Sequence, residues 1–179
     1  MTFSNPAGGA VASAAAYVRA LLEVLGEREP LDVLAELGGW LERRLEGVPD
    51  AALRRAEAPG KWSALEVVQH LADSDLVFGF RLRMILTADR PPLQGYDQDG
   101  WAATLRYRDG ALADALAQLE VLRAANLRVL RRLGPEELER TGVHGERGAE
   151  SLGHLTKLMA GHDLVHRRQI ERVLAAAGA

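Results

Sequence analysis

The chain has 179 residues and a mass of 19.4 kDa, the usual size of one domain. Its 22 basic and 25 acidic residues give a formal net charge of −3, which suits a soluble globular protein and argues against nucleic-acid binding, because such binding usually needs a cationic surface. The absence of cysteine excludes disulfides, thiolate metal sites, iron–sulfur clusters and a thiol nucleophile supplied by the chain.

The apolar stretch at residues 10–18 is shorter than the roughly 20 residues that a membrane span needs, and no basic residue precedes it as in a signal peptide. We therefore expect a cytoplasmic protein without membrane contact. We also expect one domain over residues 1–179, with its core at about 30–175.

Alanine, leucine, arginine and glutamate dominate the composition, which favours helix over strand along the chain. Glycine and proline breakers separate five long segments with helical apolar spacing. The third has the clearest start, because Ser63 precedes Glu66 by three residues in the capping-box pattern, and Ser151 is a plausible cap for the fifth. The predicted helices span residues 10–25, 30–45, 64–86, 111–133 and 152–174.

The connections between these segments differ in length. Residues 87–110 are rich in turn-forming residues and include a possible short helix at 101–107, so we predict a long loop that forms a pocket wall. Residues 136–150 are predicted as a second loop. Long helices that each carry one apolar stripe predict an all-α protein, an antiparallel four-helix bundle with an extra N-terminal helix and a long loop after the His70 helix.

The fifth helix carries two histidines within its core-facing stripe. Because His162 and His166 are four residues apart, their side chains project from one face, which is the geometry for binding one metal ion. The members of this stripe are Leu152, Leu155, Met159, His162, His166, Ile170 and Val173.

A His-x-x-x-His pair also occurs by chance, and a core histidine can simply form a hydrogen bond with a neighbour. Burying an unpartnered polar group costs roughly 1–3 kcal/mol, however, so two inward imidazoles need a partner. His70 of the third helix can reach the same interior point in a bundle. Three neutral imidazoles would leave coordination positions open, and they favour zinc or nickel while remaining compatible with iron or manganese.

Two other histidines and one acidic residue are weaker candidates. His154 faces away from the stripe and is expected at the surface, whereas His144 lies in the second loop and could overhang the site, although an ordinary loop position is favoured. Asp163 points about 100° away from His162 on a helix, so it is expected as a supporting or surface group rather than a ligand.

Further polar residues leave alternatives open. Asp73 could share a face with His70 or be solvated, and Asn126 could line a cavity or bond to a backbone carbonyl. Tyr96, Asp97, Asp99 and Trp101 could form the rim of a pocket, or the aromatic rings could pack over the end of the bundle. Asp73, Asp97 and His144 are the candidates for a general base. The arginine pairs, scattered among acidic residues, indicate a solvated surface.

Three stretches of the sequence form a set. Residues 59–63 read Pro-Gly-Lys-Trp-Ser and lead to Gln-His-Leu-Ala-Asp at 69–73. The loop at 96–99 reads Tyr-Asp-Gln-Asp and is followed by Trp101. Residues 162–166 read His-Asp-Leu-Val-His. In this order the three stretches resemble the DinB-like (DinB/YfiT) superfamily. The chain departs from the family pattern in its Ala-rich stretch at 10–16, and in Asp75, where many members have Glu.

This resemblance implies a four-helix bundle that holds one divalent ion on His70, His162 and His166, and it implies a homodimer. Characterised relatives include thiol-dependent S-transferases and a mycothiol-dependent isomerase, and others are described as metal hydrolases. We therefore expect a metal-dependent enzyme in which the ion activates water or a low-molecular-weight thiol against a small electrophilic substrate. The alternatives are a non-catalytic metal- or ligand-binding protein related to stress and a purely structural bundle.

Overall fold

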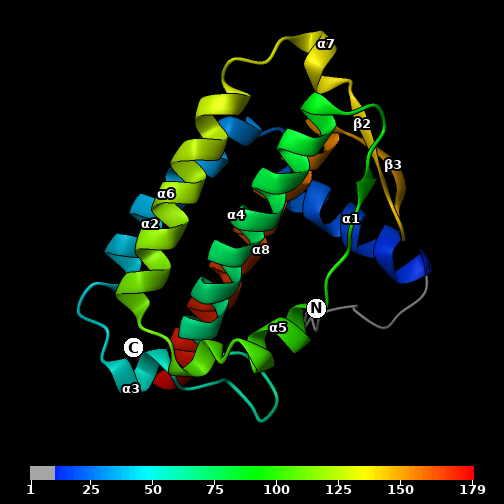
Figure 1. The fold of residues 1–179 in the computed structure, drawn as a ribbon. Coiled ribbons are helices and arrows are strands. Elements are labelled where there is room, and N and C mark those ends of the chain that lie inside the picture. The colour runs from blue at the N-terminus through cyan, green and yellow to red at the C-terminus, as the bar shows by residue number, and fades with distance from the viewer. Residues whose placement is uncertain (1–10) are drawn as a thin grey trace.

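Four long helices form a bundle in the computed structural model, which describes residues 11–179 (Figure 1). Each of α2, α4, α6 and α8 packs against two of the others, in the order α2, α6, α4, α8, and α1 packs on the outside of α8. The predicted bundle with its extra N-terminal helix is confirmed, although the expected start at Ala10 lies outside the described residues. The bounds are α1 Val11–Leu25, α2 Pro30–Leu45, α4 Ala64–Thr87, α6 Leu112–Leu130 and α8 Leu152–Ala177.

The sequence predicted an antiparallel bundle, and this part of the prediction is wrong. The neighbours α4 and α6 run in the same direction, because the chain after α4 returns to the starting end of the bundle before α6 begins (Figure 1). Likewise, α2 and α8 are parallel to each other and antiparallel to the other two. Successive contacts between α4 and α6 advance together along both helices: Asp73 with Gln118, Asp75 with Arg123, and Arg83 with Asn126.

Both predicted helix caps are present. Ser63 Oγ accepts a hydrogen bond from the Glu66 amide, and Glu66 Oε2 accepts one from the Ser63 amide at 2.8 Å, which completes the capping box of α4. Ser151 Oγ accepts from the His154 amide at the start of α8. These caps fix where the two histidine-bearing helices begin.

The connections contain more structure than the sequence predicts. Residues 136–150 are not simply a loop: they include part of α7, the strand β2 and most of β3, and β2 also pairs in parallel with β1 from the long connection after α4. A short helix was expected at 101–107, and it begins earlier because Asp97 caps it through the Gly100 amide. The short elements are α3 Asp50–Leu53, β1 Pro92–Leu93, α5 Gln98–Thr104, the 3₁₀ turn η1 Tyr107–Asp109, α7 Pro135–Leu138, β2 Thr141–His144 and β3 Gly148–Ser151.

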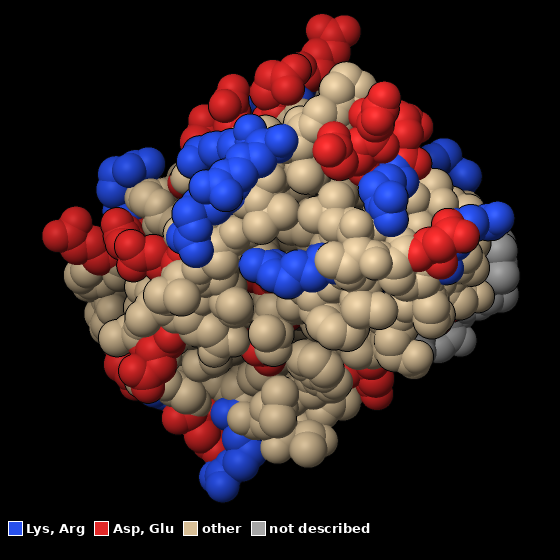
Figure 2. Space-filling model, turned by 45° about the horizontal axis from the view of Figure 1, so that its top comes forward, with Lys and Arg blue, Asp and Glu red and all other residues tan. Residues whose placement is uncertain are grey.

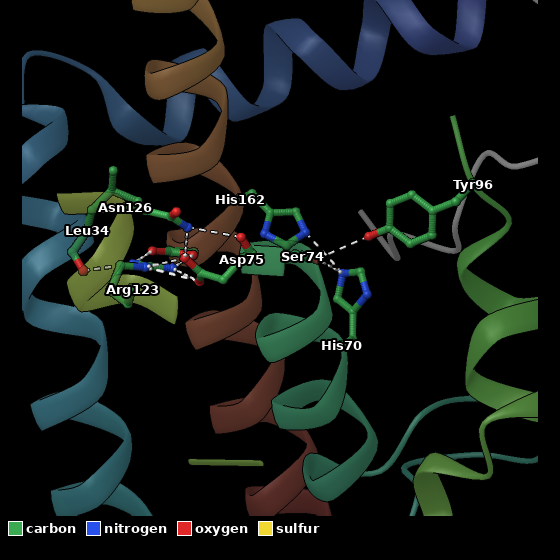
Figure 3. A network of polar contacts seen from close by, with 9 residues as sticks. Leu34, His70, Ser74, Asp75, Tyr96, Arg123, Asn126 and His162 are labelled. Atoms are coloured by element: carbon green, nitrogen blue, oxygen red, sulfur yellow. Dashed lines mark hydrogen bonds and ion pairs between the residues drawn. The ribbon is translucent and has the colours of Figure 1, made fainter. Parts of the chain in front are cut away.

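The guanidinium of Arg123 joins all four bundle helices (Figure 3). From α6 it donates to both oxygens of Asp75 on α4, to both oxygens of Asp163 on α8, and to the Leu34 carbonyl of α2. Burial lowers the pKa of Arg123, but the two carboxylates outweigh this effect and raise it, so the guanidinium stays charged. Burial raises the pKa of Asp163 to about 6 against the opposing effect of Arg123. Asn126 donates to the backbone carbonyl of Asp75, which is one of its two predicted roles.

The surface has mixed charge. Figure 2 shows acidic and basic side chains of both signs on one face of the molecule, separated by uncharged residues. Within residues 11–179, no helix combines the length and the apolar character that crossing a bilayer would require.

Helix α1 approaches α8 very closely at one glycine. A Cβ placed on Gly161 would lie 2.3 Å from the backbone carbonyl oxygen of Leu21, whereas a Cβ on Gly153 of the same helix would meet its nearest neighbour, the Leu138 oxygen, at 3.4 Å. Only a residue without a side chain therefore permits the observed packing of α1 at position 161.

We predict that Gly161→Ala destabilises the protein by about 1–3 kcal/mol, because the new methyl group meets backbone that has to move. Gly153→Ala, the matched control in the same helix, should leave stability unchanged or raise it slightly, since alanine favours helix. Urea unfolding followed by circular dichroism measures both. Equal midpoints for the two variants would show that α1 is not docked as tightly as described.

We also predict that Arg123→Met costs about 3–5 kcal/mol, because it leaves two buried carboxylates without their cation. The triple variant Asp75→Asn, Arg123→Met, Asp163→Asn should lose less, since no unpaired charge remains. Arg128→Met, at an exposed position of the same helix, serves as the control and should change stability by less than about 0.5 kcal/mol. Unfolding midpoints that do not distinguish Arg123→Met from Arg128→Met would contradict a central role for this network.

Candidate metal centre

Three histidines from two helices meet inside the bundle. His70 lies in the second turn of α4, and His162 and His166 lie in the middle of α8, which runs antiparallel beside it (Figure 3 labels the first two). The Nε2 atoms of His70 and His162 are 3.0 Å apart, and one potential ligand atom from each of the three residues lies within 4.8 Å of the others. The structure thus brings together the three residues that the sequence singled out as ligands.

These imidazoles are buried and neutral. Their exposed fractions are 0% for His70, 8% for His162 and 9% for His166. Burial lowers the pKa of all three, to about 4 for His166. His166 further lowers the pKa of His70 and of His162, and His70 further lowers that of His162. Neutral imidazoles have the lone pairs that a metal ion requires.

The hydrogen bonds of the rings are incomplete. His166 Nδ1 lies 2.7 Å from Gln169 Oε1, an acceptor that fixes the proton on Nδ1 and leaves the Nε2 lone pair free. The Nδ1 atoms of His70 and His162 are buried without a partner, and their Nε2 atoms face each other, where one proton at most can lie between them. Among the described residues no carboxylate bonds to these rings.

This donor set fits a divalent cation. Two nitrogens bound at the usual distance of about 2.1 Å in tetrahedral geometry lie about 3.4 Å apart, close to the separation of the two Nε2 atoms. A cation bound there would replace the single proton that the two nitrogens can share by two metal–nitrogen contacts. Three nitrogen ligands do not fill a coordination sphere, so further positions stay open.

The turn before α4 closes one side of the cluster. Gly60 adopts a left-handed conformation with φ of +74°, which turns the chain back so that Trp62 lies over the His70 ring at a centroid distance of 4.9 Å. The Pro-Gly-Lys-Trp-Ser stretch therefore has two structural roles: it places Trp62 against His70, and its last residue, Ser63, caps α4.

Two hydroxyl groups adjoin the histidines from the side of the long connection (Figure 3). Ser74, one turn after His70, places Oγ 3.3 Å from His70 Nε2 and 3.2 Å from the Tyr96 hydroxyl. Burial raises the pKa of Tyr96, so its phenol stays protonated at neutral pH. These hydroxyls can therefore donate hydrogen bonds beside the cluster.

A cavity of about 500 Å³ adjoins the site, and His166, Gln169 and Trp62 form part of its wall. A smaller cavity of about 110 Å³ lies against His162 and Ser74. Other residues of the larger wall come from α1, the long connection and the turn between β2 and β3: Tyr17, Tyr96, Asp97, Asp99, His144 and Arg147. The long connection is thus a pocket wall, as predicted.

The three candidates for a general base lie in different places. Asp97 lines the larger cavity at an exposed position, where one oxygen caps α5. Asp73 is not part of the cavity wall, and its carboxylate accepts hydrogen bonds from Tyr107 and Gln118.

His144 is not an ordinary loop residue: it ends β2, is buried and lines the larger cavity. Its Nδ1 accepts a hydrogen bond from the Glu146 amide, which places the ring proton on Nε2. Burial, together with Arg147 and Arg81, lowers its pKa, so the ring is neutral at pH 7. The sequence favoured an ordinary loop position because β2 and β3 are only four residues long and β1 lies about 50 residues away, which leaves little local signal.

Three other residues that the sequence analysis discussed lie near the histidine cluster or on its helices. Asp163 is neither a ligand nor a surface group, since it is fully buried against Arg123. Asp75 likewise bonds to Arg123, so the shorter side chain at this position serves the ion network. His154 lies outside the histidine cluster, as expected, but it is half-buried rather than solvated at the surface. Sequence reasoning missed Arg123 and Arg81, although Arg81 follows His70 and Ser74 at helical spacing on α4.

The comparisons with known proteins agree with this arrangement. A model of the DinB superfamily matches residues 36–170. An Oceanobacillus iheyensis protein named as a putative metal-dependent hydrolase is 32% identical over 142 residues, which cover 79% of this chain and 82% of the relative. A protein of the same description from Geobacillus thermodenitrificans is 28% identical, with 80% and 81% covered.

Among solved structures, YfiT from Bacillus subtilis superimposes with a TM-score of 0.74 at 24% sequence identity, covering 82% of this chain and 88% of YfiT. YfiT is described as a probable metal-dependent hydrolase with an unusual four-helix bundle topology. The fold is therefore shared, and three quarters of the chain fit the family model. The chain belongs to the DinB superfamily.

Proposed function

We propose that this protein is a metal-dependent enzyme in which His70, His162 and His166 hold one divalent ion at the wall of the larger cavity. The observation that carries the proposal is the cluster itself: three buried, neutral imidazoles with mutually close nitrogens, two of them otherwise short of hydrogen bonds. Relatives named as metal-dependent hydrolases support it.

The bound ion would lower the pKa of water or of a thiol, so that a stronger nucleophile exists near neutral pH. The chain contributes the remaining functions. Gln169 orients His166, Trp62 covers His70, and the hydroxyls of Ser74 and Tyr96 are placed to donate hydrogen bonds beside the ligands. The cavity holds a small electrophilic substrate against this side of the bundle.

Water and a low-molecular-weight thiol are the two candidate nucleophiles. The names of the relatives favour water, whereas the thiol version agrees with a chain that has no cysteine of its own. We propose Asp97 as the general base in either case, because its carboxylate lines the cavity, whereas Asp73 does not and His144 presents a proton rather than a lone pair at Nε2. A non-catalytic binding protein is the alternative, and it would bind metal without turnover.

We predict that protein purified without a histidine tag binds one divalent ion per chain and that His70→Ala loses this binding, because two ligands on one helix cannot replace the third. His154→Ala, on the same helix as the other two ligands, should bind like the wild type. Zinc, nickel, iron and manganese are compared by titration calorimetry and elemental analysis.

Metal should also stabilise the wild type, by about 2.7 kcal/mol at a free concentration 100 times the dissociation constant. If the wild type takes up none of these metals, or if His70→Ala binds as well as His154→Ala, the metal proposal fails.

We further predict that turnover depends on the ion. In the hydrolase version a chromogenic aryl ester is cleaved at a rate that added thiol does not change, whereas in the transferase version an aryl halide reacts only when a bacterial low-molecular-weight thiol is present. A chelator and His70→Ala should each abolish the activity, and Asp97→Asn should lower it by about 10²–10⁴-fold. Full metal occupancy with neither reaction would instead favour the non-catalytic alternative.

A further inference from the structure

Arg81 is a cation without an ionic partner at the cavity wall. It lies on α4, eleven residues after His70, and lines both cavities beside the histidines. Its Nη2 donates to the Gln94 carbonyl, its Nε is buried without an acceptor, and no carboxylate of residues 11–179 lies within ion-pair distance of it. Arg81 as a whole is half-buried, but a buried donor without an acceptor is rare in folded proteins and calls for an explanation.

The neighbouring charges leave Arg81 unbalanced. Arg147 is a nearby cation, but its Nε and Nη2 donate to the two carboxylate oxygens of Glu150, at 2.6 Å and 2.9 Å. Burial and then Arg147 lower the pKa of Arg81, which nevertheless keeps its charge at any physiological pH. Asp97, Asp99 and Glu146 line the cavity as well, but none of them forms an ion pair with Arg81.

A second donor lies on the same wall. His144 carries its proton on Nε2, because Nδ1 accepts the Glu146 amide, and Nε2 has no partner among the described residues. Arg81 and Arg147 lie close enough to this ring to disfavour its protonation. The charge of Arg81, which no ion pair neutralises, and a neutral N–H donor therefore lie on the same wall, together with Lys61 and the carboxylates of Asp97, Asp99 and Glu146.

We propose that Arg81 and His144 form a subsite for a carboxylate group of the substrate. A planar guanidinium matches a carboxylate with two parallel hydrogen bonds. Because three carboxylates also line the cavity, a singly charged carboxylate is favoured over a doubly charged phosphate. The inference rests on the proposed function, because it names a chemical property of the molecule that the histidine site would transform.

The spacing also sets the shape of that molecule. Eleven residues of α4 rise roughly 16 Å between the backbones of His70 and Arg81, and helical side chains lean toward the N-terminus, so the guanidinium extends back toward the histidines. The substrate would then carry its carboxylate at one end and its reactive centre several bonds away. The aromatic side chains of Trp62, Tyr17 and Tyr96 line the same cavity and offer apolar surface to the rest of the molecule.

The test measures the binding of benzoate, its neutral isostere benzamide and inorganic phosphate to the full chain by calorimetric or NMR titration. Metal-free and metal-loaded protein are compared, since benzoate could also bind a metal directly. We expect the wild type to prefer benzoate, and Arg81→Gln to weaken benzoate binding at least tenfold, about 1.4 kcal/mol, while benzamide binding is unchanged. Arg128→Gln removes the same charge from an exposed site on α6 and should have no effect.

Several outcomes would overturn the subsite: equal affinity of the wild type for benzoate and benzamide, an unchanged Arg81→Gln variant, or a variant that loses both probes alike, which would make Arg81 structural. Tighter binding of phosphate than of benzoate would refute the assignment to a carboxylate. The titration of metal-free protein separates the two proposals. If the wild type takes up no metal but still binds benzoate in a way that depends on Arg81, the metal proposal is refuted and the carboxylate subsite stands.

Discussion

The ion network around Arg123 holds the interior of this bundle in register. One guanidinium bonds to groups on α2, α4 and α8 while it is itself fixed on α6, so it limits how far any of these helices can slide or rotate. Two of its partners are next to the histidine cluster in sequence: Asp163 follows His162, and Asp75 lies five residues after His70. The histidines can converge only if α4 and α8 keep this alignment. The network holds the two helices in this alignment from the side of α4 and α8 that lies opposite the histidines (Figure 3).

A polar layer of this kind needs apolar packing on both sides. One cluster, around Leu37, Leu41, Leu71 and Ile170, fills the end of the bundle where α4 begins, and another, around Leu34, Phe78, Leu82 and Leu152, fills the other end. The hydrophobic effect stabilises the fold through these clusters, whereas the buried charges between them contribute specificity more than stability. The middle of the bundle can therefore hold groups that would be unfavourable in a uniform core.

The long helices and the histidine stripe could be predicted because helical apolar spacing and capping motifs are local signals. Ser63 with Glu66 marks the start of a helix, and the spacing of His162 and His166 places both on one face of the last helix. The roles of Arg123 and Arg81 could not be predicted in the same way, since an arginine in a helix is usually solvated and its partners here come from distant segments. The sheet was missed for a related reason: β2 pairs with residues 92–93, about 50 positions away, and short strands have little local signal.

The parallel arrangement of α4 and α6 also explains how the wall of the site is built. Because α4 and α6 are parallel, the chain between them has to travel the length of the bundle, and it does so as an irregular segment (Figure 1). That segment contributes β1, Tyr96 and Asp97 to the side of α4 on which His70 and Ser74 lie, and β1 in turn anchors the hairpin that carries His144 and Arg147. An up-and-down bundle with short connections would bring the same three histidines together but would leave them without this wall. The parallel pair thus explains why this bundle has a cavity beside its polar layer, and why most of the residues that line it come from connections rather than from the four helices.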